Sequence, residues 1–206
     1  MKINNNQLSE AVEVIRKGGV VAYPTETYYG LGVDPFNLKA LSRLFQLKKR
    51  PHAKPILTLV SDLKQLSLLT TEIPEIYNPL CSLWPAPLTL VFPSLPLLPE
   101  LLTGGTGTVA VRMSPHPLAS ALVQACGHPI TATSANISGE KAAITPEEVR
   151  SHFGTHIDFI LEGGETCGGL PSTVIGMQHG KLMLIRDGVI PFEKISKIVS
   201  RSIGLP

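Results

Sequence analysis

The 206-residue sequence has little charge, few aromatic residues and no long hydrophobic run. Charged residues make up 17% and aromatic residues 5%, whereas apolar types reach 43%. This balance provides enough apolar material for a core and too little charge for a disordered chain. No apolar run reaches the ~18–20 residues that span a bilayer, and the first residues lack the apolar stretch of a signal peptide. We therefore expect a soluble, cytoplasmic protein with no membrane partner.

Cysteine is scarce, and the common catalytic and nucleotide-binding motifs are absent. Cys81, Cys126 and Cys167 are too few and too widely spaced for a disulfide framework, so we expect reduced, mostly buried thiols. The sequence contains no G-x-x-x-x-G-K-[ST], no G-x-G-x-x-G and no G-x-S-x-G. His152 and His156 lie four residues apart but enclose a glycine, and no C-x-x-C occurs. A dedicated metal site is therefore not expected.

The hydrophobic pattern alternates between helical and strand periods along the chain. It predicts helices at 7–17, 38–47, 72–83, 117–126 and 192–202, and two more that begin after Ser61-Asp62 and after the Thr145 cap. Strands are predicted at 20–23, 55–60, 88–92, 108–113, 128–132, 158–161, 172–177 and 181–186. No proline-rich or charged linker divides the chain. These patterns predict one α/β domain over residues 1–206, built around a mixed sheet.

The net charge of +2 hides an uneven distribution. Residues 1–60 hold nine bases and four acids, whereas residues 61–206 hold nine bases and twelve acids. Four of the early bases, Lys48, Lys49, Arg50 and Lys54, lie within seven residues at the end of a predicted helix. Cations cap a helix C-terminus favourably, but four exceed that need. They are typical of a site for a polyphosphate or a nucleic-acid backbone.

Arg112 is the only base between Lys64 and Lys141, and it ends an apolar strand. An arginine in such a position is costly unless it meets an anion. The nearest acid in the sequence is Glu100, so a structural partner stays possible, and we favour a carboxylate or phosphate of a ligand.

Short polar motifs follow several predicted strands, where α/β sheets bind ligands. The first covers residues 24–32 and includes Thr25 and Tyr29, and another covers residues 131–139 and includes Ser134 and Asn136. Residues 168–173 and 184–188 are similar in style. The alternative for the first motif is a turn whose threonines satisfy local backbone groups.

In their order along the chain, these motifs resemble the YrdC/TsaC family, the L-threonylcarbamoyladenylate synthases. The matching pieces extend from residue 20 to residue 188 and are Pro24-Thr25-Glu26-Thr27-x-Tyr29-Gly30-Leu31-Gly32, Lys48-x-Arg50-Pro51, Trp84-Pro85-x-Pro87-Leu88-Thr89, Val109-Ala110-Val111-Arg112, Ser134-Ala135-Asn136-x-Ser138-Gly139, Ser172-Thr173 and Leu184-Ile185-Arg186-x-Gly188. The resemblance implies a single α/β domain with a twisted mixed sheet around a deep, positively lined cavity. Four positions depart from the family pattern: Ala86 replaces glycine, Tyr28 replaces a small β-branched residue, Lys54 stands where asparagine is common, and Asp187, beside Arg186, stands where proline or glutamate is more usual.

The resemblance also implies an ATP-dependent synthesis. L-Threonine would take up bicarbonate or CO2, and the product would attack ATP to give threonylcarbamoyl-AMP and pyrophosphate. Downstream threonylcarbamoyl-transfer proteins would then pass the group to adenosine in tRNA, so this reaction would be the first step of threonylcarbamoyladenosine modification.

Site residues carried over from the family fall into three sets. The resemblance places Lys48 and Arg50 at the ATP phosphates, with Mg2+ carried by ATP. It places Thr25, Tyr29 and Arg112 at threonine. The remaining contacts, to the bound intermediate and the nucleotide, are assigned to Ser134, Asn136, Ser172 and Arg186.

Two other functions compete with this interpretation. A module that only binds double-stranded RNA or tRNA would use the basic window, which consists of Lys48, Lys49, Arg50 and Lys54. Such modules usually have broader basic surfaces and aromatic platforms. A carbamoyl-transfer domain like that of hydrogenase maturation factors shares the implied fold and chemistry, yet it belongs to much longer chains with zinc-finger parts.

Overall fold

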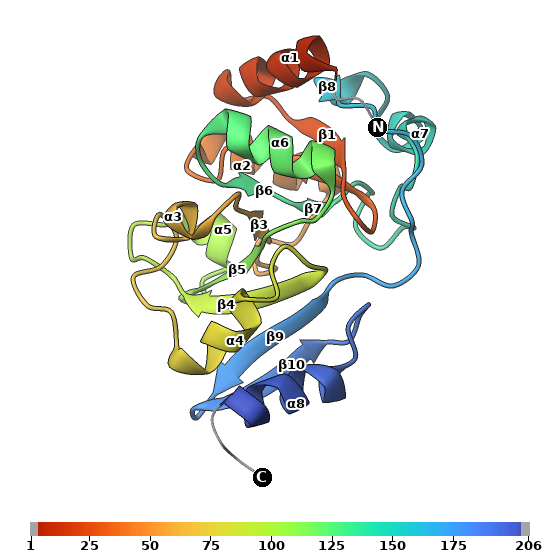
Figure 1. Cartoon of the computed structure of the whole chain (residues 1–206). Helices are drawn as coiled ribbons and strands as arrows, with labels where there is room; N and C mark the ends of the chain where they lie inside the picture. Colours follow the sequence, from red (N-terminus) through yellow and green to blue (C-terminus); the bar gives the residue numbers. More distant parts are fainter. Residues whose placement is uncertain (1–3, 203–206) are drawn as a thin grey trace.

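The computed structural model describes residues 4–202 and shows an α/β architecture (Figure 1). Its helices are α1 (Asn5–Arg16), α2 (Leu38–Lys48), α3 (Leu63–Leu66), α4 (Asn78–Cys81), α5 (Glu100–Thr103), α6 (Pro117–Cys126), α7 (Pro146–Phe153) and α8 (Phe192–Ser202), with 3-10 turns η1 (Glu75–Tyr77) and η2 (Gly154–His156). Its strands are β1 (Val21–Pro24), β2 (Tyr29–Gly32), β3 (Thr58–Leu59), β4 (Leu88–Pro93), β5 (Thr108–Arg112), β6 (Ile130–Thr131), β7 (Thr133–Ser134), β8 (Phe159–Ile160), β9 (Thr173–Gln178) and β10 (Lys181–Arg186).

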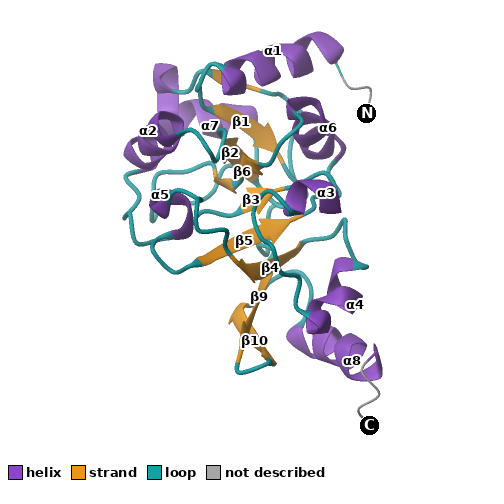
Figure 2. Cartoon of the chain, turned by 90° about the vertical axis from the view of Figure 1, so that its left-hand side faces the viewer, coloured by secondary structure: helices purple, strands orange, loops and turns teal. Residues whose placement is uncertain are grey.

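The strands form two mixed sheets. One has the order β7-β2-β1-β8 and the other the order β10-β9-β4-β5-β3-β6. Both sheets contain parallel pairs (β1 with β8, β3 with β5, β4 with β9), and their other pairs are antiparallel. Helices α1 and α8 lie at opposite ends of the molecule, and α8 lies beside α4 (Figures 1 and 2). The predicted α/β class is confirmed, but the strands divide into two sheets where one was predicted.

Alternating side chains on β4 and β5 separate a core from a cavity wall. Leu88, Leu90 and Phe92 are fully buried in the main hydrophobic core, as are Val109 and Val111. The intervening residues Thr89, Val91, Thr108, Ala110 and Arg112 point the other way and line a cavity. This is the period-2 pattern of a strand with two different faces.

Several predicted elements differ from the observed ones. The predicted helix at 72–83 is broken into η1 and α4, since Pro74 and Pro79 cannot donate a backbone hydrogen bond. The predicted strand at 55–60 is reduced to β3. The motif at 24–32 was predicted as a polar segment after a strand, yet it contains a second strand, β2, which pairs antiparallel with β1. Ala86 has no positive φ, so alanine is compatible with the backbone there.

Helix α2 carries the basic window, and its ends are well defined. The Asn37 side-chain oxygen accepts hydrogen bonds from the backbone N–H groups of Lys39 and Ala40, both at 3.1 Å. The helix ends at Lys48 and is followed by the C-cap residue Lys49, whose φ of 49° is left-handed. Lys48 and Arg50 thereby leave the helix in different directions.

Replacing Asn37 with alanine is expected to lower the free energy of unfolding by about 1 kcal/mol, because two N–H groups of the first turn lose their acceptor. Urea denaturation of the full chain measures this loss. Asn37→Asp, which keeps an accepting oxygen, is the control and should retain most of the stability. Equal stability of Asn37→Ala and the parent chain would contradict the capping role.

Candidate functional site

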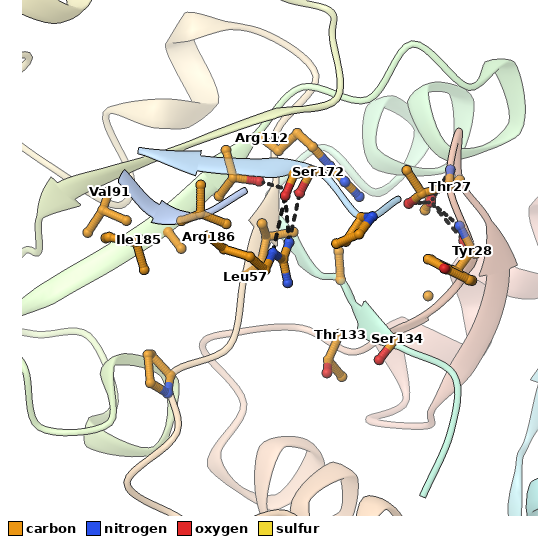
Figure 3. A pocket seen from close by; sticks show the side chains of 18 of the residues that line it. Thr27, Tyr28, Leu57, Val91, Arg112, Thr133, Ser134, Ser172, Ile185 and Arg186 are labelled. Carbon is orange, nitrogen blue, oxygen red and sulfur yellow. Dashed lines mark hydrogen bonds between the residues drawn. The ribbon is translucent and has the colours of Figure 1, made fainter. Parts of the chain in front are cut away.

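A cavity of about 430 Å3 is lined by residues from both sheets (Figure 3). The β1–β2 turn, β2 and β7 contribute one side, and β4, β5, β9 and β10 contribute the other. Three arginines, Arg50, Arg112 and Arg186, line it, and no aspartate or glutamate does so in the described part of the chain. An apolar wall is formed by Pro55, Leu57, Val91, Ala110, Val174 and Ile185. The cavity therefore suits an anionic ligand with an apolar portion.

The β1–β2 turn places hydroxyl groups at the cavity. The Thr25 hydroxyl donates to the Tyr28 carbonyl oxygen at 2.7 Å and lies 3.3 Å from the Thr27 hydroxyl. The alternative of a locally satisfied turn is therefore realised, although Thr25, Thr27 and Tyr28 also line the cavity. In Figure 3, Thr27 and Tyr28 lie apart from Arg112, Ser172 and Arg186.

Tyr29 begins β2, and its hydroxyl joins the cavity wall to the segment at 163–164. It donates to the Gly164 carbonyl oxygen at 2.8 Å and accepts from the Gly163 N–H at 3.1 Å. Burial raises the pKa of Tyr29 above its ordinary value, so the phenol is neutral at physiological pH. Tyr29 thus lines the cavity as a fixed, uncharged side chain.

Arg112 has a protein partner that its position in the sequence did not indicate. Its Nη1 lies 3.0 Å from Oε1 of Glu26, and both side chains are largely buried. The Ser114 hydroxyl donates to the other carboxylate oxygen of Glu26. The structural partner that stayed possible for Arg112 is therefore present, because the β1–β2 turn brings Glu26 to the end of β5. The Nε of Arg112 is buried without a hydrogen-bond partner in residues 4–202.

Arg186 lies at the end of β10 and is held by Ser172. Its Nε and Nη2 donate to the Ser172 carbonyl oxygen at 3.2 and 2.9 Å, and Nη2 also donates to the Ser172 hydroxyl at 3.0 Å. Burial lowers the pKa of Arg186, and the charge of Arg112 lowers it further. Two guanidinium groups thus share one region of the cavity, which favours an anion between or beside them. Asp187 forms no ion pair with Arg186 in the described residues.

The two bases predicted to contact phosphate lie in different environments. Arg50 lines the cavity and donates to the Lys54 and Pro55 carbonyl oxygens at 3.2 and 2.8 Å. Lys48 does not line it, because its side chain is turned inward and only 1% of the residue is exposed. Burial and the Arg50 charge lower the pKa of Lys48 to about 7. The predicted contact between Lys48 and phosphate does not agree with this placement.

Asn136 also lies behind the cavity surface. Its side-chain oxygen accepts from the Ser134 hydroxyl at 2.7 Å and from the Lys48 ammonium at 3.0 Å. Ser134 itself lines the cavity at the end of β7. The structure therefore brings seven of the nine predicted residues to one cavity, namely Thr25, Tyr29, Arg50, Arg112, Ser134, Ser172 and Arg186, and places Lys48 and Asn136 just beneath it.

The sequence interpretation missed Glu26 and Ser114. Glu26 belongs to the motif at 24–32, and a carboxylate in a turn that follows a buried strand could have been considered as a partner for Arg112. Ser114 lies two residues after Arg112, beyond the end of β5, and its hydroxyl donates to the Glu26 carboxylate. Glu26 pairs with Arg112 directly, whereas Ser114 acts through its hydrogen bond to Glu26, and neither residue lines the cavity.

Other predictions concern metals, thiols and membranes. No group of three or more His, Cys, Asp or Glu side chains in residues 4–202 is arranged to hold a metal ion.

Cys81 and Cys126 are partly buried, and burial raises their pKa values to about 11 and about 12. Cys167 is exposed, so the prediction of mostly buried thiols is wrong for that residue. Within the described residues, no helix has the length and apolar character needed to cross a membrane.

Comparisons with known proteins agree with the motifs. The model of the Sua5/YciO/YrdC family, described as telomere recombination, matches residues 13–188. The threonylcarbamoyl-AMP synthase of Pyrococcus abyssi is 40% identical over 96% of this chain, which covers 58% of that protein. The synthase of Vibrio cholerae (El Tor) is 39% identical, and the match covers 88% of this chain and 97% of that protein.

The structure of the chain agrees with solved structures of the same kind. The crystal structure of P. abyssi Sua5 complexed with L-threonine has a TM-score of 0.92 and 40% identity, over 96% of this chain and 58% of that one. This chain also spans 58% of the Bacillus subtilis synthase, to which it is 38% identical, so it covers a little over half of some of its relatives. Because the family model matches most of the chain and these relatives exceed 30% identity, the chain belongs to the Sua5/YciO/YrdC family.

Proposed function

We propose that this protein forms threonylcarbamoyl-AMP from L-threonine, bicarbonate or CO2 and ATP, with release of pyrophosphate. The observation that carries the proposal is a single cavity bordered by three guanidinium groups and an apolar wall, with no acidic side chain on its surface in residues 4–202. The names of the relatives and the threonine complex of P. abyssi Sua5 support it. The product would pass to threonylcarbamoyl-transfer proteins that modify tRNA, in the cytoplasm.

The proposed reaction needs no nucleophile from the protein. The threonine amino group adds to CO2, loses a proton and gives an N-carboxylate. An oxygen of this carboxylate attacks the α-phosphorus of ATP, the bond between the α-phosphorus and the bridging oxygen breaks, and pyrophosphate leaves. Such a displacement depends on positioning and on stabilisation of negative charge. A cavity surface to which residues 4–202 contribute no acidic side chain is compatible with this requirement.

The guanidinium groups provide the charge that the proposal requires. Arg112 would bind the threonine carboxylate near the β1–β2 turn, where Thr25 and Tyr29 lie. Arg50 and Arg186 would bind phosphate oxygens, and Ser134 and Ser172 would contact the intermediate and the nucleotide. Since none of the described residues brings a carboxylate to the cavity surface, Mg2+ would arrive bound to the phosphates of ATP as part of the substrate.

The proposal predicts that pyrophosphate release depends on threonine, bicarbonate and ATP-Mg together. Initial rates are measured with each component left out in turn, and the expected result is full activity only with all three. Turnover that does not require threonine, or no turnover with all three present, would contradict it.

The alternative function, tRNA binding without synthase activity, has less support from the structure than from the sequence. Lys48, one of the four bases of the basic window, is buried and contributes no charge at the surface. A chain that bound tRNA with a steep salt dependence and formed no adenylate would nevertheless favour that alternative.

A further inference from the structure

Lys48 is buried, and all of its hydrogen-bonding capacity is used inside the protein. An ammonium group has three N–H donors. The Lys48 ammonium donates to the Ser134 carbonyl oxygen, to the Asn136 carbonyl oxygen at 2.8 Å and to the Asn136 side-chain oxygen at 3.0 Å. Three acceptors for three donors leave no N–H group for a ligand.

The acceptors belong to one loop, residues 134–140, which the lysine holds at several points. The Lys48 carbonyl oxygen accepts from the Ser138 N–H at 2.8 Å. The Asn136 side-chain N–H donates to the Glu140 carbonyl oxygen at 2.6 Å. The 134–140 loop is thus closed around a single cation by side-chain and backbone contacts.

The loop connects the buried lysine to the cavity. Ser134 pairs with Gly30 of β2, and the Ala135 N–H donates to the Tyr29 carbonyl oxygen at 2.7 Å. Ser134, Gly30 and Tyr29 all line the cavity. A displacement of the loop would therefore move the section of the cavity wall that these three residues form.

Arg50 has the properties that Lys48 lacks. It lines the cavity, and of its five N–H donors the structure assigns Nε to the Lys54 carbonyl oxygen and Nη2 to the Pro55 carbonyl oxygen. Donors remain for a ligand. If Lys48 turned toward a phosphate, by contrast, the oxygens of Ser134 and Asn136 would lose a buried charged donor.

We propose that Lys48 is a positioning residue whose ammonium group fixes the 134–140 loop and the cavity wall at Ser134, and that Arg50 makes the phosphate contact. The proposal deepens the proposed function and rests on it for the identity of the nucleotide. Its distinguishing consequence is that loss of Lys48 weakens binding of every nucleotide alike, whatever its number of phosphates.

The test measures binding of AMP, ADP and ATP by calorimetry to the full chain and to three variants. Lys48→Met is expected to weaken all three nucleotides by a similar factor, roughly 10-fold. Arg50→Met should weaken ATP by roughly 10-fold more than AMP. Lys49→Met removes an exposed charge from the same window and is the matched control, with binding close to that of the parent chain.

A second readout follows the loop itself. Amide hydrogen exchange at residues 134–140 should be faster in Lys48→Met and unchanged in Arg50→Met. If Lys48→Met does not fold, Asn136→Ala removes one acceptor and should give the same pattern in weaker form. A loss in Lys48→Met that grows with the number of phosphates, or unchanged exchange in the loop, would overturn the proposal. If the parent chain binds no nucleotide but exchange in the loop is still faster in Lys48→Met, the loop contact is supported and the proposed function is contradicted.

Discussion

Replacing Glu26 with alanine is expected to lower the free energy of unfolding by roughly 3–5 kcal/mol. The side chains of Arg112 and Glu26 are only 6% and 13% exposed, and their charged atoms lie 3.0 Å apart. Without Glu26, a guanidinium group that already has an unpartnered Nε would stay buried without its counter-charge. The variant would also remove the acceptor of the Ser114 hydroxyl, which joins the segment after β5 to the β1–β2 turn. Guanidinium chloride denaturation measures the loss.

Two controls separate burial from charge in this experiment. Glu147→Ala removes a partner of Arg150 whose side chain is 77% exposed, and it should change stability by no more than about 1 kcal/mol. The double variant Glu26→Ala with Arg112→Met removes both charges and should recover part of the stability lost in Glu26→Ala. A loss below about 1 kcal/mol in Glu26→Ala would show that the ion pair does not contribute as its burial indicates.

Replacing Arg112 with lysine is expected to raise the KM for threonine by roughly 10- to 150-fold. The substitution keeps a positive charge for Glu26 but removes the planar fork of donors that matches a carboxylate. Loss of one charged hydrogen bond of about 1.5–3 kcal/mol corresponds to this range. The measurement is the initial rate of pyrophosphate release against threonine concentration, at saturating ATP and bicarbonate.

A comparison of the KM for threonine with the KM for ATP provides the control for this experiment. Arg112→Lys should change the KM for ATP by less than about 3-fold, whereas Arg186→Lys should affect the KM for ATP more than that for threonine. An Arg112→Lys variant with an unchanged KM for threonine would remove the assignment of Arg112 to the amino-acid carboxylate.

The long elements of the fold could be predicted from the sequence because their local signals are strong. Helices α2, α6 and α8 and strand β10 lie where the hydrophobic period placed them, within one residue at each end. The division into two sheets could not be predicted. Strands β3, β6, β7 and β8 have two residues each, which is too short for a period of two to be recognised, and their pairing is decided by tertiary contacts.

The sequence predicts the residue types of the candidate site, but it does not predict their partners or the directions of their side chains. Residue types at strand ends indicated Arg112 and Arg186, but the partner of Arg112 lies 86 positions earlier in the chain, at Glu26. Lys48 and Arg50 are two positions apart and were predicted to act together. The left-handed residue Lys49 separates them, so that one points into the protein and the other toward the cavity. Side-chain direction after a helix end depends on such backbone detail, which composition does not contain.

The most direct test of the account is the mass of the adenylate formed from threonine, ATP-Mg and 13C-labelled bicarbonate. We expect a threonine–AMP adduct that contains one additional carboxyl carbon, and that carbon should carry the 13C label. An adduct of threonine and AMP without that carbon would mean that the protein activates the threonine carboxylate directly, and it would contradict the proposed synthesis of threonylcarbamoyl-AMP.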